Sequence, residues 1–149
     1  MENIIVVCPH CGAKNRVPEN RIKEHPVCGR CRQPLRIDPG MIHPMNVTDS
    51  SFGREVMQYP GVVLVMFWSP RCPYCRQLAP VIDRLAPEFA GRARIAKFDV
   101  DQNRIVPSQF TVSGVPTTMI VKHGKVLHRL TGVVSKEELI REVEAAISH

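Results

Sequence analysis

Six cysteines arranged as three C-x-x-C pairs constrain this 149-residue chain more than any other feature. Two of the pairs begin at Cys8 and Cys28, in a short basic N-terminal segment. The third begins at Cys72 and directly follows the apolar run VVLVMFW. This difference in setting predicts one metal site that holds four thiolates and one dithiol that is left free to react.

The spacing Cys8-x2-Cys11-x16-Cys28-x2-Cys31 is typical of a zinc ribbon, in which two turns each supply two sulfurs to a tetrahedral ion. Four sulfurs fill every zinc position, so we expect a structural rather than a catalytic ion.

Other interpretations of these four cysteines remain open. Two structural disulfides are disfavoured in a reducing cytosol, and a redox-sensing cluster is a further alternative. His10 lies between the first two cysteines, but the zinc shell is complete without it. Gly12 and Gly29 suit the tight turns that such a ribbon requires.

The composition changes near residue 38. Residues 1–45 contain no Phe, Trp or Tyr, and a segment this small without a large apolar core generally needs a metal or disulfides to fold. The stretch Asp38–Pro44 carries two prolines and a glycine, which is typical of a linker. We therefore predict a zinc ribbon at 1–37, a linker at 38–46 and a second domain at 47–149.

The second domain alternates between strand and helix patterns. Its order predicts an α/β fold, in which a mixed central sheet is flanked by helices. The helix at its C-terminal end carries a capping box from Ser135 to Glu138. The predicted strands are 62–68, 94–100, 117–122 and 125–130, and the predicted helices are 49–59, 72–89, 105–110 and 135–147.

The third C-x-x-C pair lies where a strand leads into a helix. A cysteine at a helix N-terminus is close to unpaired N–H groups and the positive end of the dipole, which favour thiolate over thiol. Arg71 and Arg76 add positive charge. We expect Cys72 to attack a target disulfide and Cys75, one turn later and more buried, to resolve the mixed disulfide. The alternative, a second metal half-site, would need two more ligands from a partner chain.

Residues 62–149 resemble the thioredoxin family in five features. These are the strand-to-helix C-x-x-C, Phe67-Trp68 upstream of it, DVDQN at 99–103, GVPT at 114–117 and an HGKV hairpin. With the ribbon, nearly the whole chain resembles the zinc-carrying thioredoxins of bacteria. The resemblance implies a thioredoxin fold and a cytoplasmic protein-disulfide reductase with a redox-active Cys72–Cys75 disulfide. It also implies recharging by thioredoxin reductase with NADPH.

The resemblance also indicates which residues meet the substrate. It implies a cis peptide between Val115 and Pro116 beside the dithiol, where the Val115 backbone is free to pair with an extended substrate strand. The expected substrate-binding residues are Trp68, Pro73, Tyr74, Val115, Pro116 and Gly132.

The chain departs from the family pattern around its dithiol. The usual W-C-G-P-C is R-C-P-Y-C here, and Pro73-Tyr74 is the dipeptide of glutaredoxins. If this dipeptide moved the reduction potential from the thioredoxin range toward the glutaredoxin range, the reduced form would be stabilised by roughly 2–3 kcal/mol. Met66 stands where the family has an acid that helps to deprotonate the resolving cysteine, whereas Lys97 beside it remains. Cys75 would then resolve slowly near neutral pH; alternatively, Met66 merely fills core volume.

Charge and composition exclude other classes of protein. Residues 1–45 hold seven Lys and Arg against four Asp and Glu, and the rest hold thirteen against ten, so the net charge of +6 is spread evenly. With no dense basic stripe and no aromatics in the ribbon, we expect no nucleic-acid binding. We expect no membrane association and no export, because there is neither a run of about 20 apolar residues nor a secretory pattern at the start.

Three other functions remain as alternatives. The ribbon could dock a partner, with the second domain as scaffold in a redox-sensitive adaptor or binding module. The C-P-Y-C pair could serve a disulfide isomerase or an oxidant. The ribbon thiolates could also sense oxidants by releasing zinc.

Overall fold

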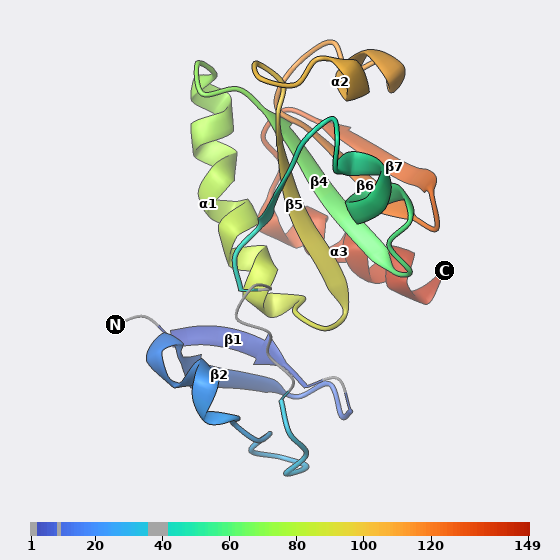
Figure 1. Cartoon of the computed structure of the whole chain (residues 1–149). Helices are drawn as coiled ribbons and strands as arrows, with labels where there is room; N and C mark the ends of the chain where they lie inside the picture. The colour runs from blue at the N-terminus through green and yellow to red at the C-terminus, as the bar shows by residue number, and fades with distance from the viewer. Residues whose placement is uncertain (1–2, 9, 36–41) are drawn as a thin grey trace.

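The computed structural model describes residues 3–8, 10–35 and 42–149, and in these ranges the chain forms two separate sheets (Figure 1). A two-stranded hairpin precedes a five-stranded sheet that is covered by helices. The elements are β1 (Asn3–Val7), β2 (Lys14–Pro18), the 3-10 helix η1 (Glu19–Glu24), β3 (Met45–Val47), the π-helix η3 (Gly53–Met57), β4 (Val62–Trp68), α1 (Pro73–Glu88), β5 (Ala93–Asp99), α2 (Ile105–Gln109), β6 (Thr117–Lys122), β7 (Lys125–Thr131) and α3 (Lys136–Ser148).

The central sheet has the order β3-β5-β4-β6-β7. Strands β3, β5 and β4 run parallel, while β6 is antiparallel to β4 and β7 is antiparallel to β6. The predicted α/β fold with a mixed sheet is therefore confirmed. At the β6–β7 turn, His123 and Gly124 both have positive φ (51° and 77°), as a two-residue hairpin loop requires.

Strand β4 lies at the centre of this sheet, and residues 62–67 are each at most 2% exposed. Its alternate side chains enter two different cores. Leu64 and Met66 pack with α1 and α3 on one face, whereas Val63, Val65 and Phe67 pack with η3 and α2 on the other. Figure 1 shows these helices on the two sides of the sheet. The continuous apolar run of β4 follows from burial on both faces.

The N-terminal hairpin has a small core of its own. Strands β1 and β2 pair antiparallel, from Asn3 opposite Pro18 to Val7 opposite Lys14. The core consists of Val6, Cys8, Val17, Cys28, Leu35 and Ile42.

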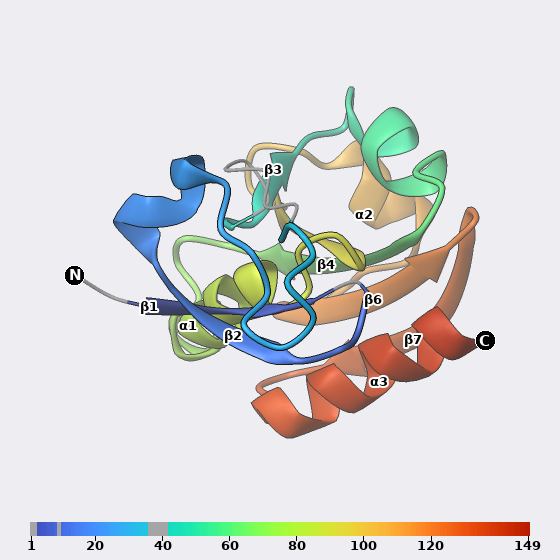
Figure 2. The ribbon, with the colours of Figure 1, turned by 90° about the horizontal axis from the view of Figure 1, so that it is seen from below.

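The hairpin lies against the C-terminal half of α1, at the end of the molecule away from the start of that helix (Figures 1 and 2). A cleft of about 770 Å³ is formed between them, lined by Asn3 and Ile5 of β1 and by residues 83–88 of α1 among others. The hairpin therefore does not cover the N-terminus of α1, where the third cysteine pair is found.

The segment predicted as a linker contacts the core of the hairpin and also begins the first strand of the central sheet. Residues 38–41 lie outside the described residues. Ile42, only 9% exposed, packs into the core of the hairpin. Met45 and Asn46 already belong to β3, which pairs with β5. A three-residue strand directly after Pro44 is too short to leave a periodic signal, which is why the sequence did not reveal it.

The predicted helices agree with the structure to within a few residues, except for the first. The segment predicted as a helix at 49–59 forms only the short π-helix η3 at 53–57. The capping box of α3 is present, since the Ser135 hydroxyl accepts a hydrogen bond from the Glu138 N–H at 3.1 Å. Among the described residues, no helix is long and apolar enough to cross a membrane.

Candidate functional site

The third cysteine pair lies at the junction between β4 and α1. Cys72 is the N-cap residue of α1, and Pro73 occupies its first turn, where no N–H donor is needed. The Cys75 N–H donates a hydrogen bond to the Cys72 sulfur at 3.2 Å. The predicted strand-to-helix placement of this pair is confirmed.

The two cysteines differ in burial. Cys72 is half-buried, whereas Cys75 is only 2% exposed and belongs to the core between the sheet and α1. Burial, together with its side-chain hydrogen bond with Cys72, raises the pKa of the Cys75 thiol to about 11. Cys75 therefore remains protonated at neutral pH, and it must lose a proton before it can act as a nucleophile.

The Arg71 guanidinium forms its ion pair with Asp101 rather than with the dithiol. The guanidinium donates to both carboxylate oxygens of Asp101, at 3.2 and 3.3 Å, and the Ser69 hydroxyl donates to the same carboxylate at 2.7 Å. The Arg71 guanidinium and then the Ser69 hydroxyl lower the pKa of Asp101. Arg76 donates to the carbonyl oxygen of Pro70 at 3.2 Å. Arg71 and Arg76 thus flank Cys72 as expected, but their recorded hydrogen bonds go to Asp101 and to the Pro70 carbonyl.

Sequence reasoning missed Ser69 and Asp101, which fix the loop in front of Cys72. The only sequence signal for Asp101 was its place in the DVDQN run, because the pairing joins residues about thirty positions apart. The Ser69 oxygen also accepts from the Arg71 N–H at 3.2 Å, so one hydroxyl links the loop backbone to the carboxylate.

A cavity of about 280 Å³ adjoins Cys75 on one side of the dithiol. Met66, Trp68 and Lys97 line it, and Met66 is completely buried. The Lys97 ammonium pairs with Asp83 of α1 at 2.8 Å, so this cation has a carboxylate partner although position 66 carries none. Among the described residues, the buried Nε1 of Trp68 has no hydrogen-bond acceptor. Among the described residues that line this cavity, none has a carboxylate that could take a proton from Cys75.

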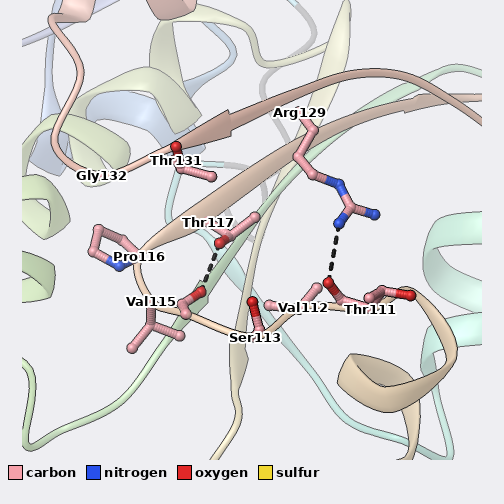
Figure 3. A pocket seen from close by; sticks show the side chains of 10 residues that line it. Thr111, Val112, Ser113, Val115, Pro116, Thr117, Arg129, Thr131 and Gly132 are labelled. Atoms are coloured by element: carbon pink, nitrogen blue, oxygen red, sulfur yellow. Dashed lines mark hydrogen bonds between the residues drawn. The ribbon is translucent and has the colours of Figure 1, made fainter.

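A second cavity, of about 260 Å³, lies between the loop that ends at Pro116 and the end of β7 (Figure 3). Val115, Pro116 and Gly132 line it, and the Val115–Pro116 peptide is cis, as expected. The Cys72 thiol approaches the Val115 carbonyl oxygen at 3.6 Å. The Gly132 N–H donates to the Pro116 carbonyl at 2.9 Å, and its φ of 79° requires a residue without a Cβ.

The expected substrate-binding residues thus surround the dithiol. Trp68 lies in the first cavity, and Val115, Pro116 and Gly132 lie in the second. Pro73 and Tyr74 are exposed at the start of α1, with Tyr74 61% exposed. Their contact with a substrate remains a prediction.

The four N-terminal cysteines come together as the spacing predicts. Their sulfurs all lie within 4.8 Å of one another, and the Cys8–Cys31 and Cys11–Cys28 pairs are each 3.6 Å apart. A tetrahedral zinc ion with Zn–S bonds of about 2.3 Å requires sulfurs about 3.8 Å apart. The geometry and the all-sulfur donor set fit zinc.

The two cysteine turns have the same hydrogen bonds. In each turn, the first cysteine accepts at its carbonyl oxygen from the residue four positions on, and its sulfur accepts from the N–H two positions on at 3.4 Å. The equivalent residues with positive φ are Gly12 (77°) and Arg32 (65°). Gly29, which the sequence suggested for this role, instead donates its N–H to the Asn15 side chain at 2.9 Å.

Hydrogen bonds prepare one of these sulfurs for a metal. The N–H groups of Cys31 and Arg30 lower the pKa of Cys28 to about 6, and the Asn15 amide donates to the same sulfur at 3.5 Å. Metal ions bind the thiolate and not the thiol, so this lowered pKa favours metal binding.

Comparisons with known proteins agree with both halves of the chain. The family model described as Thioredoxin matches residues 43–145, and the one described as Thioredoxin 2, N-terminal matches residues 7–33. A thioredoxin of Pseudomonas aeruginosa is 37% identical over 105 residues, which cover 70% of this chain and 97% of that protein. One from Haemophilus influenzae is 39% identical over 95 residues, covering 64% and 89%. Thioredoxin 1 of a Nostoc species is 40% identical over 98 residues, covering 66% and 92%.

Proposed function

We propose that Cys72 attacks the disulfide of a protein substrate and that Cys75 resolves the mixed disulfide. The chain belongs to the thioredoxin family and is a thiol–disulfide oxidoreductase. The observation that carries this assignment is the difference in exposure between two sulfurs on one helical turn. A substrate can reach the half-buried sulfur of Cys72, whereas Cys75 can reach only its neighbour.

The proposed reaction has two exchange steps. The Cys72 thiolate attacks one substrate sulfur, which forms a mixed disulfide and releases the other substrate sulfur as a thiolate. The Cys75 thiolate then attacks the Cys72 sulfur, which forms the Cys72–Cys75 disulfide and releases the second substrate thiolate. Two electrons pass from the dithiol to the substrate.

We further propose that the main chain beside Cys72 binds the substrate. Val115 precedes β6 and lies outside the paired strands, so its backbone is available to an extended polypeptide. Trp68, Pro73, Tyr74, Pro116 and Gly132 would surround that polypeptide. The 3.6 Å approach of Cys72 to the Val115 carbonyl brings the attacking sulfur next to such a strand.

The family also suggests one electron donor and one compartment. We propose that electrons come from an NADPH-dependent thioredoxin reductase and that the protein works in the cytoplasm. A reducing compartment suits a chain whose cysteines serve metal binding and catalysis rather than structural disulfides.

We also propose that the N-terminal cysteines hold one structural zinc. The residues that would hold it are Cys8, Cys11, Cys28 and Cys31, and the ion would supply folding energy to a segment with a very small apolar core. The proposed division remains a ribbon at 1–37, a joining segment at 38–46 and a thioredoxin domain at 47–149. The separate sheets and separate cores support two domains, although Met45 and Asn46 already pair in the central sheet.

A disulfide isomerase or oxidant remains the second candidate, because Pro73 and Tyr74 separate the cysteines. If these residues raise the reduction potential toward the glutaredoxin range, the reduced dithiol is favoured and reduction of substrates is weaker. A redox titration of the pair against glutathione distinguishes the two directions of exchange.

Substituting each cysteine of the dithiol tests the proposed order of attack. Cys72→Ser should abolish insulin reduction, because the dithiol then lacks its accessible sulfur and the buried Cys75 remains alone. Cys75→Ser should still attack but stop at the mixed disulfide, which non-reducing electrophoresis and mass spectrometry detect. Trapping by Cys72→Ser instead of Cys75→Ser would reverse the assignment.

Zinc content tests the metal proposal. Purified reduced protein should contain one zinc per chain by elemental analysis. Cys28→Ser should lose the metal, whereas Cys75→Ser should retain it. Chelation should collapse the NMR signals of the ribbon while those of the central sheet persist. A fully reduced, folded protein without metal contradicts the proposal.

Restoring an acid tests the consequence of Met66. Because the Cys75 thiol has a pKa of about 11, a nearby carboxylate should accelerate its deprotonation at neutral pH. We expect Met66→Asp to speed the decay of a mixed disulfide at pH 7 by about tenfold or more, with less gain as the pH rises toward that pKa.

Stopped-flow release of a chromogenic aryl thiol from Cys72 measures this decay. Met66→Leu is the matched control, since it keeps the apolar volume without a base. Urea unfolding of both variants shows whether the buried carboxylate is tolerated. If folded Met66→Asp resolves no faster than Met66→Leu, then Met66 only fills the core.

A further inference from the structure

The cavity beside the cis peptide reaches beyond the residues that the proposed mechanism uses. One wall is the loop that ends at Pro116, and the other is the end of β7, which carries Arg129 and Thr131 (Figure 3). Val115 belongs to the first wall, and its carbonyl oxygen lies 3.6 Å from the Cys72 sulfur, so this residue connects the cavity with the attacking thiol.

The lining of this cavity combines apolar groups of Val112, Val115 and Pro116 with hydroxyl groups and one charge. Hydroxyl groups come from Thr111, Ser113, Thr117 and Thr131, and Arg129 supplies a guanidinium. In the part of the chain that the structure describes, no carboxylate lines this cavity.

Arg129 has no anionic partner in the part of the chain that the structure describes. Its two recorded hydrogen bonds go to neutral main-chain carbonyl oxygens, of Phe110 at 2.6 Å and of Thr111 at 3.3 Å. A guanidinium has five N–H donors, so donors remain for a further acceptor. A carboxylate matches their planar arrangement best.

We propose that this cavity takes an acidic side chain of the substrate, and that Arg129 gives the protein a preference for Asp or Glu near the target cysteine. The inference rests on the proposed function, because it needs a substrate strand along Val115. Successive side chains of an extended strand point to opposite sides, about 3.3 Å apart along the chain. A residue one or two positions from the target cysteine can therefore enter the cavity while the cysteine meets Cys72.

A purely structural role for Arg129 makes a different prediction. Thr111 has a φ of 55°, which is unusual for a β-branched residue, and both hydrogen bonds of Arg129 hold this turn. If Arg129 did nothing else, its loss would slow the reduction of all peptides equally. The ratio of kcat/KM for acidic and basic peptides distinguishes the two roles, because an equal loss for all peptides leaves this ratio unchanged.

The experiment measures kcat/KM for three disulfide-linked peptides that differ in the residues flanking cysteine: Glu, Gln or Lys. The full-length protein should favour the Glu peptide over the Lys peptide by about two- to fivefold, as expected for a solvent-accessible ion pair. Added salt should reduce the preference. Arg129→Gln should abolish it, Arg129→Glu should reverse it, and Arg129→Lys should keep part of it.

Lys125→Gln is the matched control, since it removes an exposed cation from the other end of β7, outside the cavity. It should leave the ratio unchanged. Equal kcat/KM values for the three peptides, or a preference that Arg129→Gln and Arg129→Glu leave intact, would overturn the proposal. Should Arg129→Gln fail to fold, Arg129→Lys and the salt dependence of the unmodified protein still decide it.

Turnover of a small uncharged disulfide keeps the two proposals apart. If the unmodified protein reduces it but shows no charge preference among peptides, only the role of the cavity is wrong. If the unmodified protein reduces no disulfide at all, the proposed function fails as well.

Discussion

Burial of β4 on both faces is the constraint on which the rest of the structure depends. Each large apolar side chain that leaves water in such a strand stabilises the fold by about 1.5–3 kcal/mol. The six residues 62–67 are buried, and their alternate side chains join the two cores that flank the sheet. The strand ends at Trp68, and the loop held by Ser69 and Asp101 leads directly to Cys72. The core thereby places the dithiol just beyond the C-terminal end of the central strand β4.

The same geometry separates the two sulfurs of the dithiol. Cys72 caps α1 from outside the helix, whereas Cys75 lies on the face that packs against β4. One helical turn is enough to change the exposure of the sulfur from half-buried to 2%. The ribbon adds a third environment, at the far end of α1, where backbone N–H groups lower the pKa of Cys28 and favour a thiolate that a metal can bind. Identical C-x-x-C patterns thus acquire different chemistry from the elements that follow them.

Strongly periodic features could be predicted from the sequence. The apolar run of β4 and the capping box of α3 depend on residues close together in the chain, and the four ribbon cysteines form two close pairs with a spacing typical of zinc sites. Features that depend on distant pairs were missed or misjudged. Arg71 turns to Asp101 and Arg129 to the Phe110 carbonyl, and no local pattern records either contact. The left-handed residue in the second cysteine turn is Arg32, although a glycine was available nearby.

The most direct test of the account is to map which cysteines an alkylating reagent modifies in the native, reduced protein near neutral pH. Mass spectrometry of peptides after timed exposure to iodoacetamide gives a rate for each of the six cysteines. Cys72 should react first, while Cys75 and the four ribbon cysteines remain protected until the protein is unfolded and stripped of metal. Equal rates at Cys72 and Cys75, or ribbon cysteines that react as fast as Cys72, would contradict the division between a reactive dithiol and a metal site.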